Sequence, residues 1–351
     1  MTFAPDAPGA TKMRLVSFTA GQSRPRLGAV LGPWNDWEWI VDLNAADSRL
    51  PGDMLAFVDA CGSLSGPVWR LAKRVVAGAV RDVQRGSRAH AFRPQAVRIR
   101  APIAPRLLRD FMGFRAHIVR TRAVAGARIS PEWDRLPGYF NGNHLNVVGP
   151  GDSVPRPRFV IYEGRSRKLV PTMKLDYEAE IGFVLGRAGR NLRAKDARRC
   201  LFGVTIFNDF SARDVQATSM AVGAGPAAGK DWTNALGPCI VTRDTFGPLR
   251  DQTITVRVNG RERLGGTYRE LVFENREIAR GQRAAWTFEE MVEFASHCQG
   301  VRAGEVWGSG TIPGGCELER GDEARYLRRG DRVEIEVEGI GTLSNRIGGA
   351  S

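Results

Sequence analysis

The sequence predicts an α+β protein rich in β-structure, in which a small N-terminal domain precedes a larger mixed-β domain. With 351 residues, the chain is longer than a single compact domain usually is. Short runs of β-branched and aromatic residues, separated by Gly, Pro and Asn, outnumber the stretches with helical spacing. Strands and helices do not alternate regularly along the chain, which favours a mixed sheet over a doubly wound parallel one.

The small N-terminal α+β domain is predicted for residues 1–103. Its sequence contains strand-like runs, followed by two stretches in which apolar residues recur at helical intervals. These elements are expected at residues 13–20, 26–32, 37–44, 53–62 and 66–86. The next segment, residues 93–110, is interrupted by prolines and is typical of a connector, which places a domain boundary near residue 100.

Strands dominate the larger domain, residues 104–351. The apolar runs are expected to form strands at residues 144–149, 158–164, 177–186, 201–209, 237–242, 253–260 and 332–343. Short helices are expected at residues 194–200 and 288–298, and Thr287 would cap the second of them, whose first turn is acidic. Residues 221–229 are rich in Gly and Ala and are interpreted as a loop.

Composition and charge argue against several classes of protein. No apolar run approaches the roughly 20 residues that a membrane helix requires, and no secretory signal is recognised in residues 1–18, so we expect a cytoplasmic protein. The net charge of +13 suggests nucleic acid as a partner, but the basic residues are spread along the chain without a nucleic-acid-binding motif. Five cysteines, odd in number and never in CxxC spacing, support neither a disulfide framework nor a zinc ribbon.

The clearest chemical pattern is the run of Asp176, Glu178 and Glu180, which leads into an apolar strand. Alternate residues of a strand share a face, so these three carboxylates are expected to project the same way. A divalent cation would neutralise their repulsion, because Mg²⁺, Mn²⁺ and Ca²⁺ prefer oxygen ligands. On spacing alone, however, a solvated strand face with alternating polar residues is the stronger interpretation.

A second acidic segment lies about thirty residues later. Asn208 and Asp209 end a strongly apolar strand, and a polar stretch with Arg213 and Gln216 follows. Acidic residues at a strand end beside a loop are well placed to complete a metal site. The alternative is that Asp209 caps a short helix.

Together, these segments resemble the fumarylacetoacetate hydrolase superfamily. The paired signature is LDYEAEIGFVLG at residues 175–186 with FNDFSARDVQ at residues 207–216. Further segments resemble that family in the family's order: RDFMGFRAH at 109–117, GKDW at 229–232, GSGTIPGGCELE at 308–319 and LRRGDRVEIEVEGIGTLSNRIG at 327–348. The resemblance covers about residues 104–348. It implies the family's mixed β-sandwich or roll for the larger domain and an accessory role for residues 1–103.

The resemblance implies a metal site for a divalent cation, Mg²⁺ above all, with Mn²⁺ or Ca²⁺ as alternatives. Asp176 corresponds to a residue that is not a ligand in the family, so it is left out despite its place in the strand pattern. The ion would bridge the two oxygens of a 1,3-dicarbonyl or 2-oxo acid group. The implied ligands are Asp110, Glu178, Glu180 and Asp209.

His117 lies seven residues after Asp110, the interval of the fumarylacetoacetase-like branch, in which the corresponding His works with a Glu to activate water. A lone His is usually structural, and the surrounding motif is what favours a catalytic role here. Its partner is either Glu317 or Glu319. The motif favours Glu319, although strand alternation would put Glu317 on the same face.

The resemblance also implies that three further residues stabilise the oxyanion or enolate formed in the reaction, namely Arg213, Gln216 and Lys230. The structural alternatives are an ion pair of Arg213 with Asp214 or another neighbour, and an exposed loop position for Lys230. Which of two neighbouring aromatic rings faces the substrate is left open. The residues expected to contact substrate are Tyr139, Phe140 and Thr311.

We therefore expect an enzyme that hydrolyses a carbon–carbon bond in a 1,3-dicarbonyl, acylpyruvate or fumarylacetoacetate-like substrate, with water activated by His117 and Glu319. A decarboxylase, or a tautomerase or isomerase of a 2-oxo acid, is the alternative, because all these reactions pass through an enolate. A non-catalytic nucleic-acid-binding protein is less favoured. The expected partners are a small diketo or 2-oxo acid and a second copy of the chain in a homodimer, with neither nucleic acid nor membrane.

Overall fold

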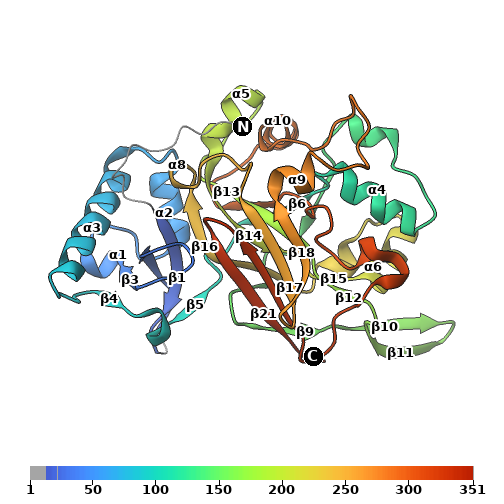
Figure 1. Ribbon diagram of the computed structural model, residues 1–351, viewed down its shortest axis with the longest axis horizontal. Helices are drawn as coiled ribbons and strands as arrows, with labels where there is room; N and C mark the ends of the chain where they lie inside the picture. Colours follow the sequence, from blue (N-terminus) through green and yellow to red (C-terminus); the bar gives the residue numbers. More distant parts are fainter. Residues whose placement is uncertain (1–12, 22, 351) are drawn as a thin grey trace.

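The computed structural model describes residues 13–21 and 23–350, and its largest feature is a sheet of twelve strands. Ten of them lie side by side in the order β4 (Ala91–Phe92), β3 (Trp39–Asp42), β2 (Arg26–Leu31), β1 (Arg14–Thr19), β16 (Asn234–Thr242), β14 (Leu201–Asn208), β13 (Ala179–Leu185), β19 (Glu305–Gly308), β6 (Leu107–Phe111) and β7 (Tyr139–Gly142). The others are β5 (Arg98–Arg100), paired with β1, and β8 (Val147–Val148), paired with β16. Because β1 pairs with β16, the sheet runs from the N-terminal part into the rest of the chain (Figure 1).

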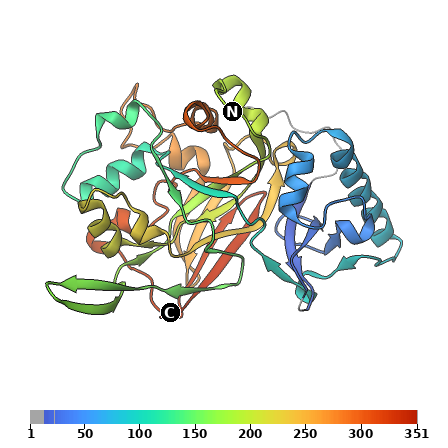
Figure 2. The same cartoon turned by 180° about the vertical axis from the view of Figure 1, so that it is seen from behind.

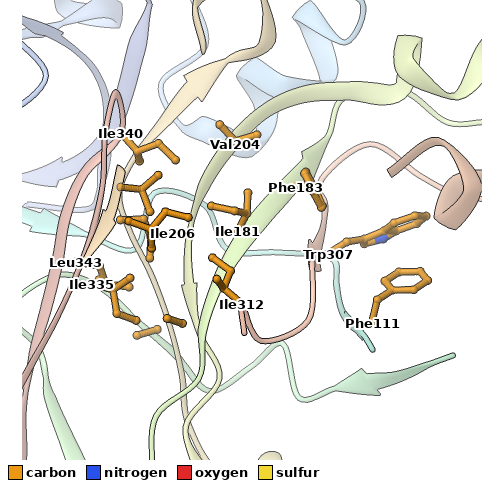
Figure 3. Packing of buried hydrophobic residues seen from close by; sticks show 14 of the residues in the cluster. Phe111, Ile181, Phe183, Val204, Ile206, Trp307, Ile312, Ile335, Ile340 and Leu343 are labelled. Atoms are coloured by element: carbon orange, nitrogen blue, oxygen red, sulfur yellow. The ribbon is translucent and has the colours of Figure 1, made fainter. Parts of the chain in front are cut away.

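A second sheet of five strands packs against the large one. Its order is β18 (Arg261–Thr267), β17 (Thr253–Val258), β20 (Arg332–Val337), β21 (Gly341–Ala350) and β9 (Ser153–Arg156). Figure 3 shows side chains of the two sheets in one cluster, with Ile181 and Ile206 from the large sheet and Ile335 and Leu343 from the second. Burying a side chain of this size contributes roughly 1.5–3 kcal/mol, so this cluster stabilises the strands that carry the site.

Two short pairs of strands lie outside these sheets. β12 (Leu175–Asp176) pairs with β15 (Ser211–Ala212). β10 (Arg158–Glu163) and β11 (Ser166–Pro171) form a hairpin that projects from the body of the molecule (Figures 1 and 2).

Helices cover the outside of the sheets (Figures 1 and 2). In the N-terminal part, α3 places Trp69, Ala72 and Val76 on its buried face, because residues three and four positions apart form one stripe of a helix. The α-helices are α1 (Leu43–Ala46), α2 (Met54–Cys61), α3 (Gly66–Gln84), α4 (Arg115–Val124), α5 (Ala194–Ala197), α6 (Arg213–Ala221), α7 (Ala227–Lys230), α8 (Arg243–Phe246), α9 (Tyr268–Val272) and α10 (Phe288–Cys298). The 3-10 helices are η1 (Pro94–Ala96), η2 (Pro131–Asp134), η3 (Arg198–Cys200) and η4 (Leu318–Glu323).

The predicted fold class is confirmed, since the structure is a mixed α+β protein rich in sheet. The helix expected at residues 288–298 is α10, and Thr287 forms a capping box with Glu290 at its start. The sequence did not predict α4 and α6, and the segment interpreted as a loop includes most of the short helix α7. The domain boundary at residue 103 falls between β5 and β6 and stays a prediction.

The acidic run near residue 178 is not one continuous strand, contrary to the expectation from its alternation. Asp176 ends β12, Glu180 belongs to β13, and Tyr177 and Glu178 lie between the two strands. β12 pairs with β15 outside the large sheet, whereas β13 pairs with β14 inside it. Asp176 and Glu180 therefore have different surroundings.

Among the described residues, no helix is long and apolar enough to cross a membrane. Most of the segment in which no secretory signal was recognised, residues 1–12, lies outside the described part of the chain. Four of the cysteines are buried free thiols, namely Cys61, Cys200, Cys239 and Cys316.

Candidate metal and catalytic site

Four carboxylates meet where neighbouring strands of the large sheet end. Asp110 belongs to β6 and Glu180 to β13, while Asp209 directly follows β14 and Glu178 directly precedes β13. One oxygen from each of these four side chains lies within 4.8 Å of the others, and all four residues are buried. The structure thus brings together all four residues that the resemblance implied as metal ligands. We call them the carboxylate cluster.

Gly308 makes room for the cluster. It lies in β19, between β13 and β6, where it pairs with Gly182 on one side and Asp110 on the other. A Cβ atom at Gly308 would lie 2.5 Å from Oε2 of Glu180 and 2.7 Å from Oδ1 of Asp110. Any larger residue would collide with two of the carboxylates, so glycine is required for this close approach.

Backbone and amide contacts fix the orientation of the cluster. The amide of Gly310 donates a hydrogen bond of 2.9 Å to Oε2 of Glu180. The amide of Glu178 donates to Oδ1 of Asn208 at 3.1 Å, and the amide of Asp209 donates to the carbonyl of Glu178 at 3.2 Å. The segment after β14 and the break before β13 therefore hold each other in place.

Three carboxylate oxygens of the cluster have no hydrogen-bond partner although they are buried: Oδ1 of Asp110, Oε1 of Glu180 and Oδ1 of Asp209. Burial raises the pKa of Asp110, and it raises the pKa of Glu180 and Asp209 well above their usual range, with neighbouring carboxylates adding to the effect. Unpaired buried acceptors are costly, and a hard divalent cation is the ligand that satisfies several carboxylate oxygens at once. The donor set therefore fits Mg²⁺ or a similar ion.

Two cations border the cluster on the side of Glu178. Nζ of Lys230 lies 2.5 Å from Oε2 of Glu178 and also contacts Asp209, while Nη1 of Arg213 lies 2.7 Å from Oε1 of Glu178. Burial favours the neutral acid at Glu178, but the charges of Lys230, Arg213 and His117 outweigh it and hold the pKa of Glu178 below its usual range. Burial would likewise lower the pKa of Lys230, yet Asp209 and Glu178 raise it, so Lys230 remains an ammonium group.

Asp176 positions Arg213 rather than joining the cluster. Its Oδ2 accepts a 2.8 Å hydrogen bond from Nε of Arg213. The carboxylate also accepts backbone amides from Tyr177, Glu317 and Leu318. Leaving Asp176 out of the ligand set therefore agrees with the geometry.

The structural alternatives for Arg213 and Lys230 have different outcomes, since Arg213 does form ion pairs, with Asp176 and Glu178. Asp214 bonds the hydroxyl of Thr172 and the amide of Met173 instead of pairing with Arg213. Lys230 is 3% exposed, so it is not a surface loop residue.

Gln216 and Gly229 lie where α6 packs against α7, next to Arg213 and Lys230. Oε1 of Gln216 accepts a 3.0 Å hydrogen bond from Nη1 of Arg213. A Cβ atom at Gly229 would lie 2.5 Å from Cβ of Gln216, so the close packing of the two helices depends on this glycine. That packing holds Lys230, the next residue, against the carboxylates.

His117, on α4, faces Glu319, on η4. Nδ1 of His117 lies 2.7 Å from Oε1 of Glu319. The other carboxylate oxygen of Glu319 accepts the amide of Gly314 at 2.7 Å and Nη1 of Arg120 at 3.1 Å. Glu319 is thus held from one side and orients His117 from the other, which leaves Nε2 of the imidazole available for proton transfer.

Glu317 has a different role from Glu319. It is fully buried, accepts a 2.9 Å hydrogen bond from the hydroxyl of Tyr177 and pairs with Arg263 at 2.5 and 2.7 Å. Strand alternation does not apply to these two glutamates, because Leu318–Glu323 forms the 3-10 helix η4. Of the two candidates, only Glu319 contacts His117.

The three residues expected to contact substrate lie in different surroundings. Adjacent strand residues point to opposite faces, so Tyr139 and Phe140 of β7 separate. Tyr139 packs on Phe111 and lies beneath Arg109, whereas the Phe140 ring lies 6.0 Å from Nζ of Lys230. Phe140 is therefore the ring at the site. Thr311 is buried and directly follows Gly310, whose amide bonds Glu180.

One positioning residue was not singled out from the sequence, and the positioning role of another, Asp176, was not predicted. Arg120 lies one helical turn after His117 on α4, and this spacing could have identified it as a neighbour of the same face. The role of Asp176 as the anchor of Arg213 depends on the break between β12 and β13, for which the sequence gives no signal.

Known proteins share this architecture. Residues 106–348 match the family model for the C-terminal domain of fumarylacetoacetate (FAA) hydrolase. The chain is 26% identical to the mitochondrial oxaloacetate tautomerase fahd2 of Xenopus laevis over 349 residues, covering 96% of this chain and 91% of that protein. It is 30% identical to the oxaloacetate tautomerase YisK of Bacillus subtilis over 213 residues, and this match spans only 60% of the chain and 61% of YisK.

A solved structure agrees with the fold. The fumarylacetoacetate hydrolase of Exiguobacterium antarcticum superposes with a TM-score of 0.66 at 24% identity, over 96% of this chain and 99% of that chain. The family model covers well over half of the sequence and includes every residue placed in the site above. The chain therefore belongs to the fumarylacetoacetate hydrolase family.

Proposed function

We propose that the protein is a divalent-metal-dependent tautomerase or isomerase of a small 2-oxo acid, with oxaloacetate or a similar 2-oxo dicarboxylate as substrate. The observation that carries the proposal is the buried carboxylate cluster with three unpaired oxygens beside Lys230 and Arg213. Such a site suits a substrate that chelates a cation through its 2-oxo acid group and becomes an enolate. The names of the Xenopus and Bacillus relatives support the same reaction class.

Asp110, Glu178, Glu180 and Asp209 would hold the cation, and Mg²⁺ suits their all-oxygen donor set, with Mn²⁺ or Ca²⁺ as alternatives. When bound, the ion supplies Lewis acidity, which polarises the 2-oxo group and makes the neighbouring carbon acidic. The buried position of the cluster excludes water, which strengthens each electrostatic contact with the substrate.

His117 is the proposed acid–base group. Its Nε2 accepts a proton from the carbon beside the 2-oxo group, and Glu319 stabilises the resulting imidazolium through the 2.7 Å contact at Nδ1. The imidazolium then returns the proton to the substrate oxygen, which completes the keto-to-enol exchange. Arg213 and Lys230 aim fixed positive charge at the oxygen on which negative charge develops, and Gln216 orients Arg213.

Hydrolysis of a carbon–carbon bond is the second candidate, and one specific observation favours it. The His117–Glu319 pair is also the arrangement that activates a water molecule, with Glu319 fixed by Arg120 and the amide of Gly314. In that reaction His117 would take a proton from water instead of carbon. Arg213, Gln216 and Lys230 would stabilise the departing enolate in the same way.

One experiment separates the two candidates. The purified protein is incubated with the enol form of oxaloacetate and with acylpyruvates, with Mg²⁺ or with EDTA. For a tautomerase, enol absorbance decays faster than without enzyme while total 2-oxo acid stays constant. For a hydrolase, two carboxylic acids appear in equal amounts from acylpyruvate. Turnover that survives EDTA would overturn the metal-dependent mechanism, and the absence of turnover on both substrates would overturn the substrate class.

A further inference from the structure

Cys316 lies beside the His117–Glu319 pair and has no part in the reaction proposed above. Its Sγ is 3.7 Å from Oε1 of Glu319, and Oε1 is the same oxygen that contacts Nδ1 of His117. One ring nitrogen of His117, Sγ of Cys316 and one carboxylate oxygen of Glu319 all lie within 4.8 Å of one another. Three potential ligand atoms of different chemistry therefore converge on one point next to the carboxylate cluster.

The two groups of ligand atoms differ in the metal that they suit. The carboxylate cluster offers only hard oxygen donors, which suit Mg²⁺, Mn²⁺ and Ca²⁺. His117, Cys316 and Glu319 offer one nitrogen, one sulfur and one oxygen, a set that suits Zn²⁺ and other cations that bind thiolates. We propose that these three residues form a second metal site, at which Zn²⁺ binds and inhibits the enzyme.

The geometry is close to that of a zinc site with three protein ligands and one open position. With ligand distances of roughly 2.0–2.3 Å, tetrahedral Zn²⁺ separates its ligand atoms by roughly 3.3–3.6 Å. The 3.7 Å between Sγ of Cys316 and Oε1 of Glu319 is close to the upper end of this range. The 2.7 Å between Nδ1 of His117 and Oε1 must open by roughly half an ångström, which a small rotation of the imidazole supplies.

Neighbouring groups hold the three side chains in an orientation that suits metal binding. Arg120 and the amide of Gly314 bind the second oxygen of Glu319, so Oε1 stays directed at His117 and Cys316. The His117 side chain is 11% exposed, and an ion can approach from that side, since Cys316 is fully buried. Binding requires the thiolate and an unprotonated Nδ1, so the thiol proton of Cys316 is released to solvent and the Nδ1 proton of His117 moves to Nε2 as the metal bonds form.

Zinc bound here would inhibit the enzyme because two of its ligands, His117 and Glu319, are also the proposed acid–base pair. An ion on Nδ1 of His117 and Oε1 of Glu319 replaces the contact that orients the imidazole and stabilises its protonated form. This consequence rests on the proposed function, because it assumes that the His117–Glu319 pair performs the proton transfer. The binding itself does not depend on that assumption.

The binding test uses Co²⁺ as a spectroscopic substitute for Zn²⁺, in excess Mg²⁺ so that the carboxylate cluster is occupied. The wild-type protein should show the near-ultraviolet absorption of a thiolate–cobalt bond, and Zn²⁺ should abolish it. Cys316→Ser and Cys316→Ala should lack the band. Cys200→Ser should keep it, because Cys200 is a buried free thiol at η3 outside the site. The absence of the band in the wild type, or its persistence in both Cys316 variants, would overturn the site.

The kinetic test measures the Zn²⁺ concentration that halves turnover in excess Mg²⁺. Loss of the thiolate ligand in Cys316→Ser should raise that concentration by roughly 100-fold or more, while turnover without zinc is retained. Cys200→Ser should match the wild type. Equal zinc sensitivity in Cys316→Ser and the wild type would mean that zinc acts at the carboxylate cluster, which contradicts the proposal. A cobalt band without inhibition would uphold the metal site and overturn the role of the His117–Glu319 pair in turnover.

Discussion

The carboxylate cluster and the His117–Glu319 pair belong to one site but balance their charges in different ways. In the cluster, buried oxygens of Asp110, Glu180 and Asp209 lack partners. In the pair, both oxygens of Glu319 are engaged, by His117, Arg120 and a backbone amide. The pair is satisfied by the chain's own residues, whereas the cluster keeps buried oxygens that a bound cation would satisfy.

The buried charges around the cluster are also out of balance. Five carboxylates, those of the cluster and Asp176, face two buried cations, Arg213 and Lys230, so the fully ionised group carries an excess of three negative charges. A divalent cation reduces that excess to one. A buried carboxylate without a partner is costly, so a cation bound at the cluster should stabilise the folded protein. The two halves of the site should therefore respond differently to mutation, metal and pH.

The largest effect is expected from Glu180→Gln, which removes one cluster charge with almost no change in shape. Lewis acidity of a bound ion contributes several kcal/mol to a rate, so turnover should fall by roughly 10³-fold or more. Calorimetry should show weakened Mg²⁺ binding, and Mg²⁺ should raise the Tm of the variant much less than that of the wild type. A variant with the wild-type Mg²⁺-induced rise in Tm would show that the ion does not bind at the cluster.

His117→Ala should disrupt the His117–Glu319 pair and leave the carboxylate cluster intact. Loss of a positioned acid–base group should lower kcat by roughly 10²-fold or more. Because His117 contacts Glu319 and not the cluster carboxylates, the rise in Tm caused by Mg²⁺ should persist. Steady-state kinetics and thermal melts measure the two properties separately. Retention of full turnover would mean that another group carries the proton.

Dependence on pH should distinguish the halves further. Burial raises the pKa of Asp110, Glu180 and Asp209, so the cation-free folded protein binds protons at the cluster more tightly than the unfolded chain does. That stabilisation is complete below the unfolded pKa values and is lost as pH rises through the raised ones. A cation must displace these protons, so its affinity increases with pH.

Thermal melts with and without Mg²⁺ test this dependence. The Mg²⁺-induced rise in Tm should be larger at about pH 8 than at about pH 6, because fewer protons compete for the cluster. Glu180→Gln provides the control, since its rise in Tm should be small at both values. A rise that shrinks as pH increases would contradict the raised pKa values.

The smallest effect on turnover is expected from Glu317→Gln. This variant should be compared with Glu319→Gln in both kcat and stability. Glu317 contacts Tyr177 and Arg263 and does not reach His117, so its change should lower stability by about 1–3 kcal/mol with turnover close to that of the wild type. Glu319→Gln should lower kcat by a larger factor than it lowers stability. Denaturant unfolding and kinetics on both variants check this, and equal losses of kcat would remove the distinction between the two glutamates.

The sequence indicated which carboxylates belong to the site but not how the chain arranges them in space. Apolar patterning is strong in β13 and β14, where every residue is buried, so these strands were recognisable. The turn of the chain at Tyr177 and Glu178 depends on pairing between β12 and β15, which local sequence does not encode. For that reason, alternation wrongly placed Asp176 on the face shared by Glu178 and Glu180.

The helix that carries His117 was missed for a physical reason. In α4 the buried residues are Arg115, Ala116 and Ile118, which do not make a repeating apolar stripe, and long basic side chains fill much of the rest. Only the resemblance, through the interval between Asp110 and His117, indicated that this histidine belongs to the site. The partner of His117 depended on η4, a 3-10 helix that the sequence pattern suggested as a strand.

The pairing of β1 with β16 has a consequence for any attempt to isolate the larger part of the chain. Leu15 pairs with Ile240 and Arg14 with Val241. β1 therefore covers the end of β16 on the edge opposite β14. Its removal would expose the backbone donors and acceptors of β16 together with Leu236 and Ile240, which are fully buried in the intact protein. An exposed apolar edge strand pairs readily with other chains. The larger part of the chain on its own should therefore be prone to self-association at β16.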